Sequence, residues 1–105
     1  MNQANVDSDF EEALKSKQKF FALFYASWCP FSRRFLPIYQ KCTKESPVPC
    51  IRIMIDDRED LCEKYNIEYY PTVLLFENGD VAKRLDAAPH EGLDEKQLKA
   101  LLGGS

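Results

Sequence analysis

Residues 20–32, with the sequence FFALFYASWCPFS, join an apolar segment to the start of a helix. Residues 20–26 are apolar at every position, which is typical of a central β-strand covered by helices on both faces. Pro30 suits the first turn of a helix, where its missing N–H is not needed. Apolar side chains at 31, 35, 38 and 42 then repeat at helical spacing, and Pro37 is expected to kink this helix. The segment therefore predicts a buried strand that passes into a helix at Cys29.

The remaining elements are short and have recognisable end signals. Ser8 with Glu11 forms a predicted capping box, and so does Asp94 with Gln97. The Asn78-Gly79 pair predicts a tight hairpin. The expected helices cover about residues 8–17, 57–65 and 95–102, and the expected strands cover 50–55, 72–77 and 81–85. The acidic residues at 56, 57, 59 and 60 are interpreted as a helix N-terminus, where the dipole favours negative charge, rather than as a metal site.

The order of these elements predicts the fold class. It runs α-β-α-β-α-β-β-α, with two crossover connections followed by a hairpin. Right-handed crossovers place the first two strands parallel and adjacent, with helices on both faces of the sheet. We therefore expect an α/β protein with three layers, α/β/α, around a mixed four-stranded sheet. Residues 1–105 are expected to form a single domain, with frayed ends at 1–7 and 103–105.

Composition excludes several classes of function. The chain has 105 residues, 45% of them hydrophobic, and a net charge of −3 without a basic stripe, which argues against nucleic acid as a partner. The apolar run at 20–26 is too short to span a membrane, and the N-terminus lacks a signal-peptide pattern. We expect a cytoplasmic monomer; a domain excised from a secreted or membrane-anchored protein is the alternative. No metal and no cofactor are expected, because cysteine spacings of 13, 8 and 12 match no zinc pattern.

Cys29 is the predicted reactive group. At the start of a helix, free N–H groups and the positive end of the dipole favour thiolate over thiol. Arg33 and Arg34, one turn further on, add positive potential. The alternative is a buried, inert cysteine. The junction of a strand and a helix is not a core position, so we expect Cys29 to be exposed and reactive.

Several segments together resemble the thioredoxin family. Residues 24–32 resemble its active-site strand and helix, and Pro37 stands where thioredoxins keep a helix-kinking proline. Residues 55–56 and 64–79 look like the stretch that leads through a cis-proline to a hairpin. The resemblance covers the chain from about residue 9 to its end and implies a thioredoxin fold. It also implies that the Tyr70–Pro71 peptide is cis and lies beside Cys29, with the Tyr70 backbone offered to substrate.

The residues around Cys29 are expected to bind substrate. Trp28, Phe31 and Tyr70 are either core residues or an exposed apolar rim for an extended peptide, and their positions favour the rim. The predicted substrate-binding residues are therefore Trp28, Pro30, Phe31, Tyr70 and Pro71, and the predicted catalytic residues are Cys29 and Ser32.

The chain departs from the thioredoxin pattern at informative positions. Ser32 stands where thioredoxins carry the second motif cysteine, which makes the motif CxxS; its hydroxyl is expected to hydrogen-bond the Cys29 thiolate. Leu23 stands where many thioredoxins bury an aspartate that serves the resolving thiol. Ala87 replaces a glycine that is usual near the substrate groove. The first six residues are too few for the usual edge strand, which is expected to be short or absent.

The other three cysteines are predicted to be core residues out of reach of Cys29. Cys42 lies 13 residues along the same helix, hence about 20 Å away at ~1.5 Å per residue. Cys62 is expected to face inward from another helix, and Cys50 to begin a core strand. A disulfide between Cys42 and Cys50 is the minority alternative.

These features predict thiol–disulfide exchange through one cysteine. Cys29 would form a mixed disulfide with a protein or small-molecule partner and be released by another thiol, as in isomerisation, deglutathionylation or client retention. One alternative is a monothiol glutaredoxin-like protein, which would bind glutathione or share an iron–sulfur cluster. The other is a peptide-binding module without turnover.

Overall fold

The computed structural model describes residues 7–44, 48–87 and 92–103. In chain order the elements are α1 (Asp7–Ser16), β1 (Phe20–Tyr25), α2 (Pro30–Thr43), β2 (Cys50–Met54), the 3₁₀ turn η1 (Ile55–Asp57), α3 (Glu59–Lys64), β3 (Thr72–Glu77), β4 (Asp80–Asp86) and α4 (Glu95–Gly103). The predicted element order is confirmed. Two residues expected in frayed ends, Asp7 and Gly103, lie within helices; residues 1–6 and 104–105 fall outside the described chain.

The four strands form one mixed sheet in the order β2-β1-β3-β4. β1 pairs parallel with β2 and antiparallel with β3, and β3 pairs antiparallel with β4. The predicted sheet is therefore confirmed, including the adjacent parallel pair. The expectation of a short or absent N-terminal edge strand concerns residues 1–6, which lie outside the described residues.

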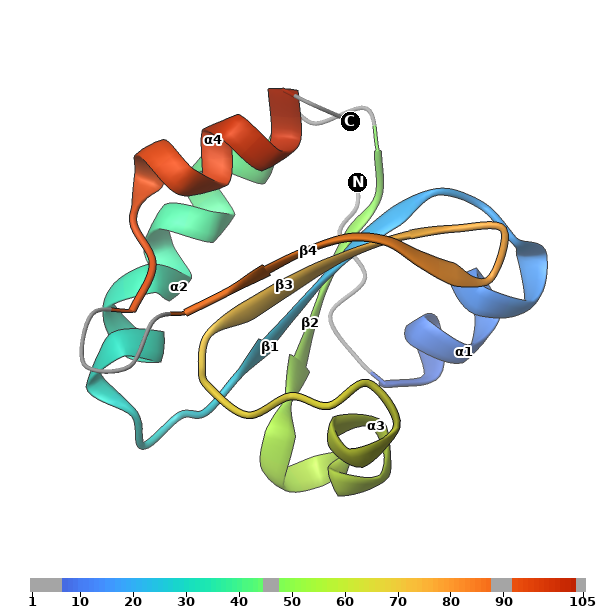
Figure 1. Ribbon diagram of the computed structural model, residues 1–105, viewed down its shortest axis with the longest axis horizontal. Helices are drawn as coiled ribbons and strands as arrows, with labels where there is room; N and C mark the ends of the chain where they lie inside the picture. Colours follow the sequence, from blue (N-terminus) through green and yellow to red (C-terminus); the bar gives the residue numbers. More distant parts are fainter. Residues whose placement is uncertain (1–6, 45–47, 88–91, 104–105) are drawn as a thin grey trace.

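Side chains alternate between two cores because successive residues of a strand point to opposite faces. In β1, Phe20, Ala22 and Phe24 join the core that α1 and α3 cover. Phe21 and Leu23 join the core that α2 and α4 cover. Figure 1 shows the two helix pairs on opposite sides of the sheet. The strand is buried on both faces, which explains its unbroken apolar sequence.

Two local signals are confirmed in detail. Asn78 and Gly79 both have positive φ, 56° and 84°, as a two-residue hairpin turn of the favoured type requires. The Gln97 N–H donates to Asp94 Oδ1 at 2.8 Å, and the Asp94 N–H donates to Gln97 Oε1 at 3.0 Å. This reciprocal capping box opens α4.

The acidic segment differs from the prediction. Residues 55–57 form the separate turn η1, and α3 begins only at Glu59. Arg58 between them has φ −138° and ψ 61°, and its N–H caps Ile55 O at 3.2 Å. The non-helical backbone at Arg58 interrupts the helix, so Asp56 lies outside α3 and close to the end of β2.

Candidate functional site

Cys29 lies at the junction of β1 and α2, as predicted. It is the N-cap of α2, with φ −92° and ψ 123°, and Pro30 occupies the first turn. The Cys29 N–H donates to Ala26 O at 3.1 Å, while Cys29 O accepts from the Arg33 N–H at 2.9 Å. The Cys29 side chain makes no capping hydrogen bond to this end of α2. The N–H groups of the first turn, which follow Pro30, lie at this end of the helix, where they favour negative charge.

The prediction that Cys29 is exposed is wrong. Only 9% of the residue is accessible, and it belongs to the apolar core on the α1–α3 face. Phe31 and Tyr70 pack against the same core. Tyr70 comes from the segment before β3, so the burial of Cys29 depends on tertiary packing and does not follow from the strand–helix junction alone. Because Cys29 is almost buried, a partner disulfide must make close contact with the residues around it to reach the Cys29 sulfur.

Ser32 is buried, with 1% of the residue accessible. Its Oγ accepts a hydrogen bond from the Ala26 N–H at 3.1 Å, rather than making the expected bond to Cys29. The backbone donor just beyond β1 is thereby satisfied. The hydroxyl hydrogen remains as a donor, one helical turn from Cys29.

Trp28 forms the exposed part of the rim. It is 61% accessible, and its ring meets Tyr70 edge-on with 6.0 Å between the centroids. The indole Nε1–H donates to Asp56 Oδ2 at 3.2 Å. This bond connects the active-site loop to η1 and holds the indole in one orientation although it faces solvent.

Phe31 lies on the other side of the motif and is half-buried. The Arg34 guanidinium lies 5.4 Å from the centre of its ring. Gly92, with φ +72°, packs its backbone against Phe31 so closely that a Cβ there would lie 3.0 Å from Phe31 Cβ and Cδ1. Only a glycine fits this contact, which sequence analysis did not identify. Pro30 between the two aromatic residues is exposed.

The Tyr70–Pro71 peptide bond is cis in the structure. Pro71 is buried, and its carbonyl accepts from the Ala87 N–H at 3.2 Å. Burial, and then the negative charges that Cys62, Asp56 and Cys29 can carry, raise the pKa of the Tyr70 phenol. Tyr70 packs against the core that contains Cys29 and lines a surface hollow together with Cys62. Ala87 is 3% accessible and supports Pro71 from β4's end.

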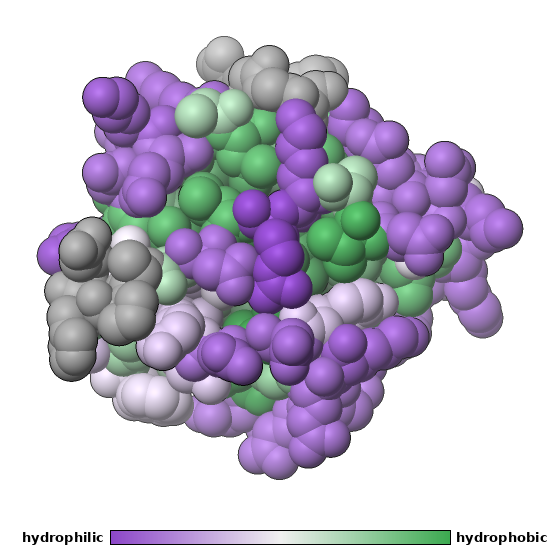
Figure 2. Space-filling view, in the orientation of Figure 1, coloured by the Kyte–Doolittle hydropathy of each residue, from purple (hydrophilic) through white to green (hydrophobic). Residues whose placement is uncertain are grey.

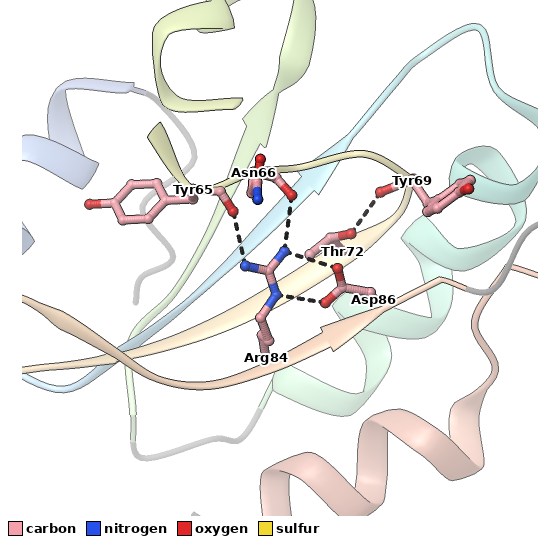
Figure 3. Close-up of polar contacts among 6 residues, drawn as sticks. All are labelled: Tyr65, Asn66, Tyr69, Thr72, Arg84 and Asp86. Carbon is pink, nitrogen blue, oxygen red and sulfur yellow. Dashed lines mark hydrogen bonds and ion pairs between the residues drawn. The ribbon is translucent and has the colours of Figure 1, made fainter. Parts of the chain in front are cut away.

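A polar network holds the loop before Pro71 (Figure 3). Arg84 of β4 donates to Tyr65 O at 2.9 Å and to Asn66 O at 3.3 Å. The Asp86 carboxylate accepts two bonds from the same guanidinium, at 2.8 and 2.9 Å, and raises its pKa. The Thr72 hydroxyl donates to Tyr69 O at 2.7 Å. Sequence analysis missed these residues; the only signal was an arginine and an aspartate two apart on one face of a strand.

The cysteines are all free, so the alternative Cys42–Cys50 disulfide is not formed. Cys50 is buried and its Sγ donates to Val48 O at 3.2 Å, whereas Cys42 and Cys62 are half-buried. Cys62 packs against the core on the α1–α3 face, as predicted, and also lines a surface hollow together with Trp28 and Tyr70. Cys42 likewise packs against the other core and lines a second hollow, so neither residue is fully buried. Burial and the nearby Asp60 and Glu59 raise the pKa of the Cys62 thiol.

Leu23 lies inside the sheet, fully buried opposite Arg52 of β2 and Val73 of β3.

Among the described residues there is no cluster of three or more His, Cys, Asp or Glu that would hold a metal ion. The helices in this part of the chain are all too short or too polar to cross a membrane.

Comparison with known proteins supports the same family. The Thioredoxin family model matches residues 2–100. The chain is 32% identical over 95 residues to Thioredoxin-1 of Caenorhabditis elegans, covering 88% of this chain and 83% of that protein. It is 34% identical to endoplasmic reticulum resident protein 44 of Mus musculus, covering 93% of this chain but only 25% of the relative. A Plasmodium falciparum thioredoxin structure superposes with a TM-score of 0.84 at 25% identity, over 96% of this chain and 97% of that one.

Proposed function

Since the chain belongs to the thioredoxin family of thiol–disulfide oxidoreductases, we propose that it exchanges disulfides through Cys29 alone. The observation that carries the proposal is Ser32. It is buried one turn after Cys29, where a dithiol enzyme of this family keeps its second thiol, and its oxygen is bonded to the Ala26 N–H. A hydroxyl at this position cannot resolve a mixed disulfide.

The exchange runs in two steps that balance without a net change in oxidation state. The Cys29 thiolate attacks one sulfur of a disulfide; the Cys29–S–S bond forms, the original S–S bond breaks, and the second sulfur leaves as a thiolate that takes up a proton. A thiolate from the same client or from a small-molecule thiol then attacks the mixed disulfide and releases Cys29. Attack by a second thiol of the same client is isomerisation.

The chain's own residues favour the first step. The N-terminal turn of α2 offers unpaired N–H groups to the developing sulfur charge, and the Ser32 hydroxyl hydrogen lies one turn away. Trp28, Pro30 and Phe31 flank Cys29 in the chain, and the cis Tyr70–Pro71 peptide brings the Tyr70 ring against Trp28. We propose that these five residues contact an extended client segment.

Cys62 lines the hollow formed with Trp28 and Tyr70, but it is a poor substitute for a resolving cysteine. Its pKa is raised by burial and by the carboxylates around it, so it stays a neutral thiol near pH 7. Only the thiolate attacks a disulfide. We therefore assign retention or isomerisation of clients, rather than net reduction, as the outcome of the reaction.

We also propose protein or small-molecule thiols and disulfides as the partners and a monomeric working state. The four free cysteines support a reducing compartment such as the cytoplasm. The relative named for the endoplasmic reticulum is four times longer than the matched region and supports the secretory pathway as the alternative. Fractionation of the natural protein in its own cells decides between the two.

The proposal is tested by trapping the intermediate. The native protein is incubated with insulin as a disulfide partner, first without and then with a dithiol reductant. We expect a mixed disulfide at Cys29 by mass spectrometry and only weak insulin reduction. Cys29→Ser should form no adduct, while Cys62→Ser, the matched control, should form it normally.

Two results would contradict the proposal. Insulin reduction as fast as that by a dithiol thioredoxin would show that another group resolves the intermediate. Partner binding that is identical in the native protein and in Cys29→Ser, without any adduct, would instead show a peptide-binding module.

A further inference from the structure

A surface hollow lies beside the reactive cysteine, between the Trp28 loop and α3. We call it the acidic hollow; it is lined by Trp28, Ile55, Asp56, Glu59, Cys62, Glu63 and Tyr70. Its volume of about 350 Å³ is near the lower end of ligand-pocket sizes, enough for a side chain but not for a folded partner. Figure 2 shows hydrophilic side chains covering the lower part of this face, where α3 lies in Figure 1.

The charge of the acidic hollow has one sign. Asp56, Glu59 and Glu63 bring three carboxylates to it, and the described residues that line it include no cationic side chain. The nearby Arg58 is committed to Glu11 at 2.6 Å and to Asp60 at 3.1 Å. Lys64, on the same helix, lies 5.6 Å from the ring centre of Tyr65. The negative potential is visible in the raised pKa of Cys62, to which Asp60, Glu59 and Asp56 contribute after burial.

The walls of the acidic hollow are aromatic. Trp28 meets Tyr70 edge-on and is 61% accessible, so its ring surface is open to a ligand. Faces of Trp and Tyr attract cations, and Trp does so most strongly. The bond from Trp28 Nε1 to Asp56 Oδ2 fixes the indole before any ligand arrives. Preorganised walls lower the entropic cost of binding.

We propose that the acidic hollow receives a lysine or arginine side chain of the client polypeptide, close in sequence to the cysteine that reacts with Cys29. The inference rests on the proposed function, because the client is the disulfide partner of Cys29. Trp28, the residue directly before Cys29, lines the hollow, and so does Tyr70, which packs on the core that contains Cys29. The hollow therefore adjoins the reacting residue. At about 3.5 Å per extended residue, a residue one or two positions from the client cysteine lies about 3.5 to 7 Å along the client, and a long side chain extends this reach. The protein thereby selects basic clients.

The experiment compares three peptides that differ at one position. Each carries a single cysteine as a mixed disulfide with thionitrobenzoate, and the residue two positions before it is Lys, Gln or Glu. Attack by Cys29 on the peptide sulfur forms the Cys29–peptide disulfide and expels coloured thionitrobenzoate with the bonding electron pair. We expect the Lys peptide to react about fivefold faster than the Glu peptide at low salt, with the Gln peptide between them. Added salt should reduce the ratio.

Two double variants test whether the acidic hollow causes the faster reaction of the Lys peptide. The double variant Glu59→Gln/Glu63→Gln should bring the Lys-to-Glu rate ratio close to one. The matched control Glu12→Gln/Glu77→Gln removes the same charge from exposed positions outside the hollow and should keep the native ratio. A native ratio of one, or a ratio that survives in Glu59→Gln/Glu63→Gln, would overturn the inference.

A binding measurement separates this inference from the proposed function. Trp28 is the single tryptophan of the chain, so its fluorescence reports on the acidic hollow. In Cys29→Ser, the Lys peptide without thionitrobenzoate should change this fluorescence at lower concentration than the Glu peptide. If no peptide reacts at Cys29 but this difference is present, the proposed function fails and the docking site stands. If the two peptides titrate alike, the docking site is refuted.

Discussion

Cys29 combines burial with a place at a helix N-terminus. The residue is almost buried, as in an inert core cysteine, yet it caps the N-terminus of a 14-residue helix. Burial in an apolar cluster disfavours a thiolate, whereas the unpaired N–H groups of the first turn favour it. Arg33 and Arg34 are exposed on the following turn and add positive potential. Reactivity at neutral pH depends on the helix end outweighing the burial.

Limited alkylation of the native protein tests that balance. We expect iodoacetamide to label Cys29 first at pH 7, although Cys42 and Cys62 are more accessible. Because its pKa is raised, Cys62 should gain reactivity only as the pH becomes alkaline. Peptide mapping after short exposure at several pH values provides the measurement. Labelling of Cys42, Cys50 or Cys62 ahead of Cys29 at pH 7 would show that burial outweighs the helix end.

Replacing Ser32 with cysteine should convert the site into a dithiol. Residues three apart at a helix start lie on one face and within the Cα separation that a disulfide requires. Mild oxidation should give a reversible bond to Cys29, and insulin reduction should rise by about tenfold or more. Sulfur is a weak acceptor, so loss of the bond to the Ala26 N–H should lower the free energy of unfolding by about 1 kcal/mol. Absence of any bond between positions 29 and 32 would contradict this geometry.

Leu23→Asp should help only when Ser32→Cys is also present. Leu23 is fully buried in the central strand, so a carboxyl group there alone should cost on the order of 4 kcal/mol. With a second thiol in place, the carboxyl group gains a proton-transfer task and reductase activity should rise above that of Ser32→Cys. Denaturant midpoints and insulin reduction of both single variants and the double variant measure the coupling. Equal gains in the two backgrounds would contradict this role.

Among the elements, β4 stabilises the active-site loop although it carries no predicted site residue. Arg84 reaches the carbonyls of Tyr65 and Asn66, and Ala87 at the end of the strand bonds Pro71. The segment before the cis-proline has no regular structure between α3 and β3. Its position therefore depends on the edge strand beside it.

Arg84→Ala should weaken that support. We expect the free energy of unfolding to fall by about 1 kcal/mol, since the guanidinium is partly exposed, and mixed-disulfide formation to slow by about threefold. Lys96→Ala, an exposed cation on α4, is the charge control and should change neither quantity. An unchanged rate of mixed-disulfide formation in Arg84→Ala would show that the loop holds its position by other contacts.

Across the whole molecule, ion pairs link elements that are distant in sequence. Arg58 joins Glu11 of α1 to Asp60 of α3 on one side of the sheet. On the other side, Glu95 of α4 pairs with Lys99 at 3.0 Å and with Lys41 of α2 at 3.7 Å. Hydrogen bonding to Arg58 lowers the pKa of Asp60, and hydrogen bonding to Lys99 lowers the pKa of Glu95.

These lowered pKa values predict how the free energy of unfolding falls at acidic pH. A carboxyl group with a lower pKa in the folded state contributes stability above its unfolded pKa and loses it as pH falls through the folded pKa. The free energy of unfolding should therefore decline below about pH 4. Urea midpoints at pH 7, 5, 4 and 3 provide the measurement. Asp60→Asn should flatten this decline more than Asp57→Asn, its exposed neighbour; equal slopes would contradict the role of Arg58.

Local sequence was enough to predict the architecture. The unbroken apolar run at 20–26, the helical spacing after Pro30 and the Asn78-Gly79 turn each follow from short-range periodicity or backbone chemistry. The element order also indicated an adjacent parallel pair of strands and a hairpin, both of which the structure has. The antiparallel pairing of β3 with β1 was not predicted. The same local reasoning placed Cys29 at a helix start and Ser32 one turn later. These features depend on residues within a few positions of one another.

Tertiary structure alone decided the surroundings of the sulfur. Cys29 is nearly buried because Phe31 and Tyr70 pack on the same core, and Cys62 lines a hollow because α3 begins only after η1. The bonds from Trp28 to Asp56 and from Arg84 to Tyr65 join positions 28 and 19 apart in the chain. Contacts between residues so far apart in the chain produce no recognisable pattern in the sequence, because they depend on how separate elements pack together.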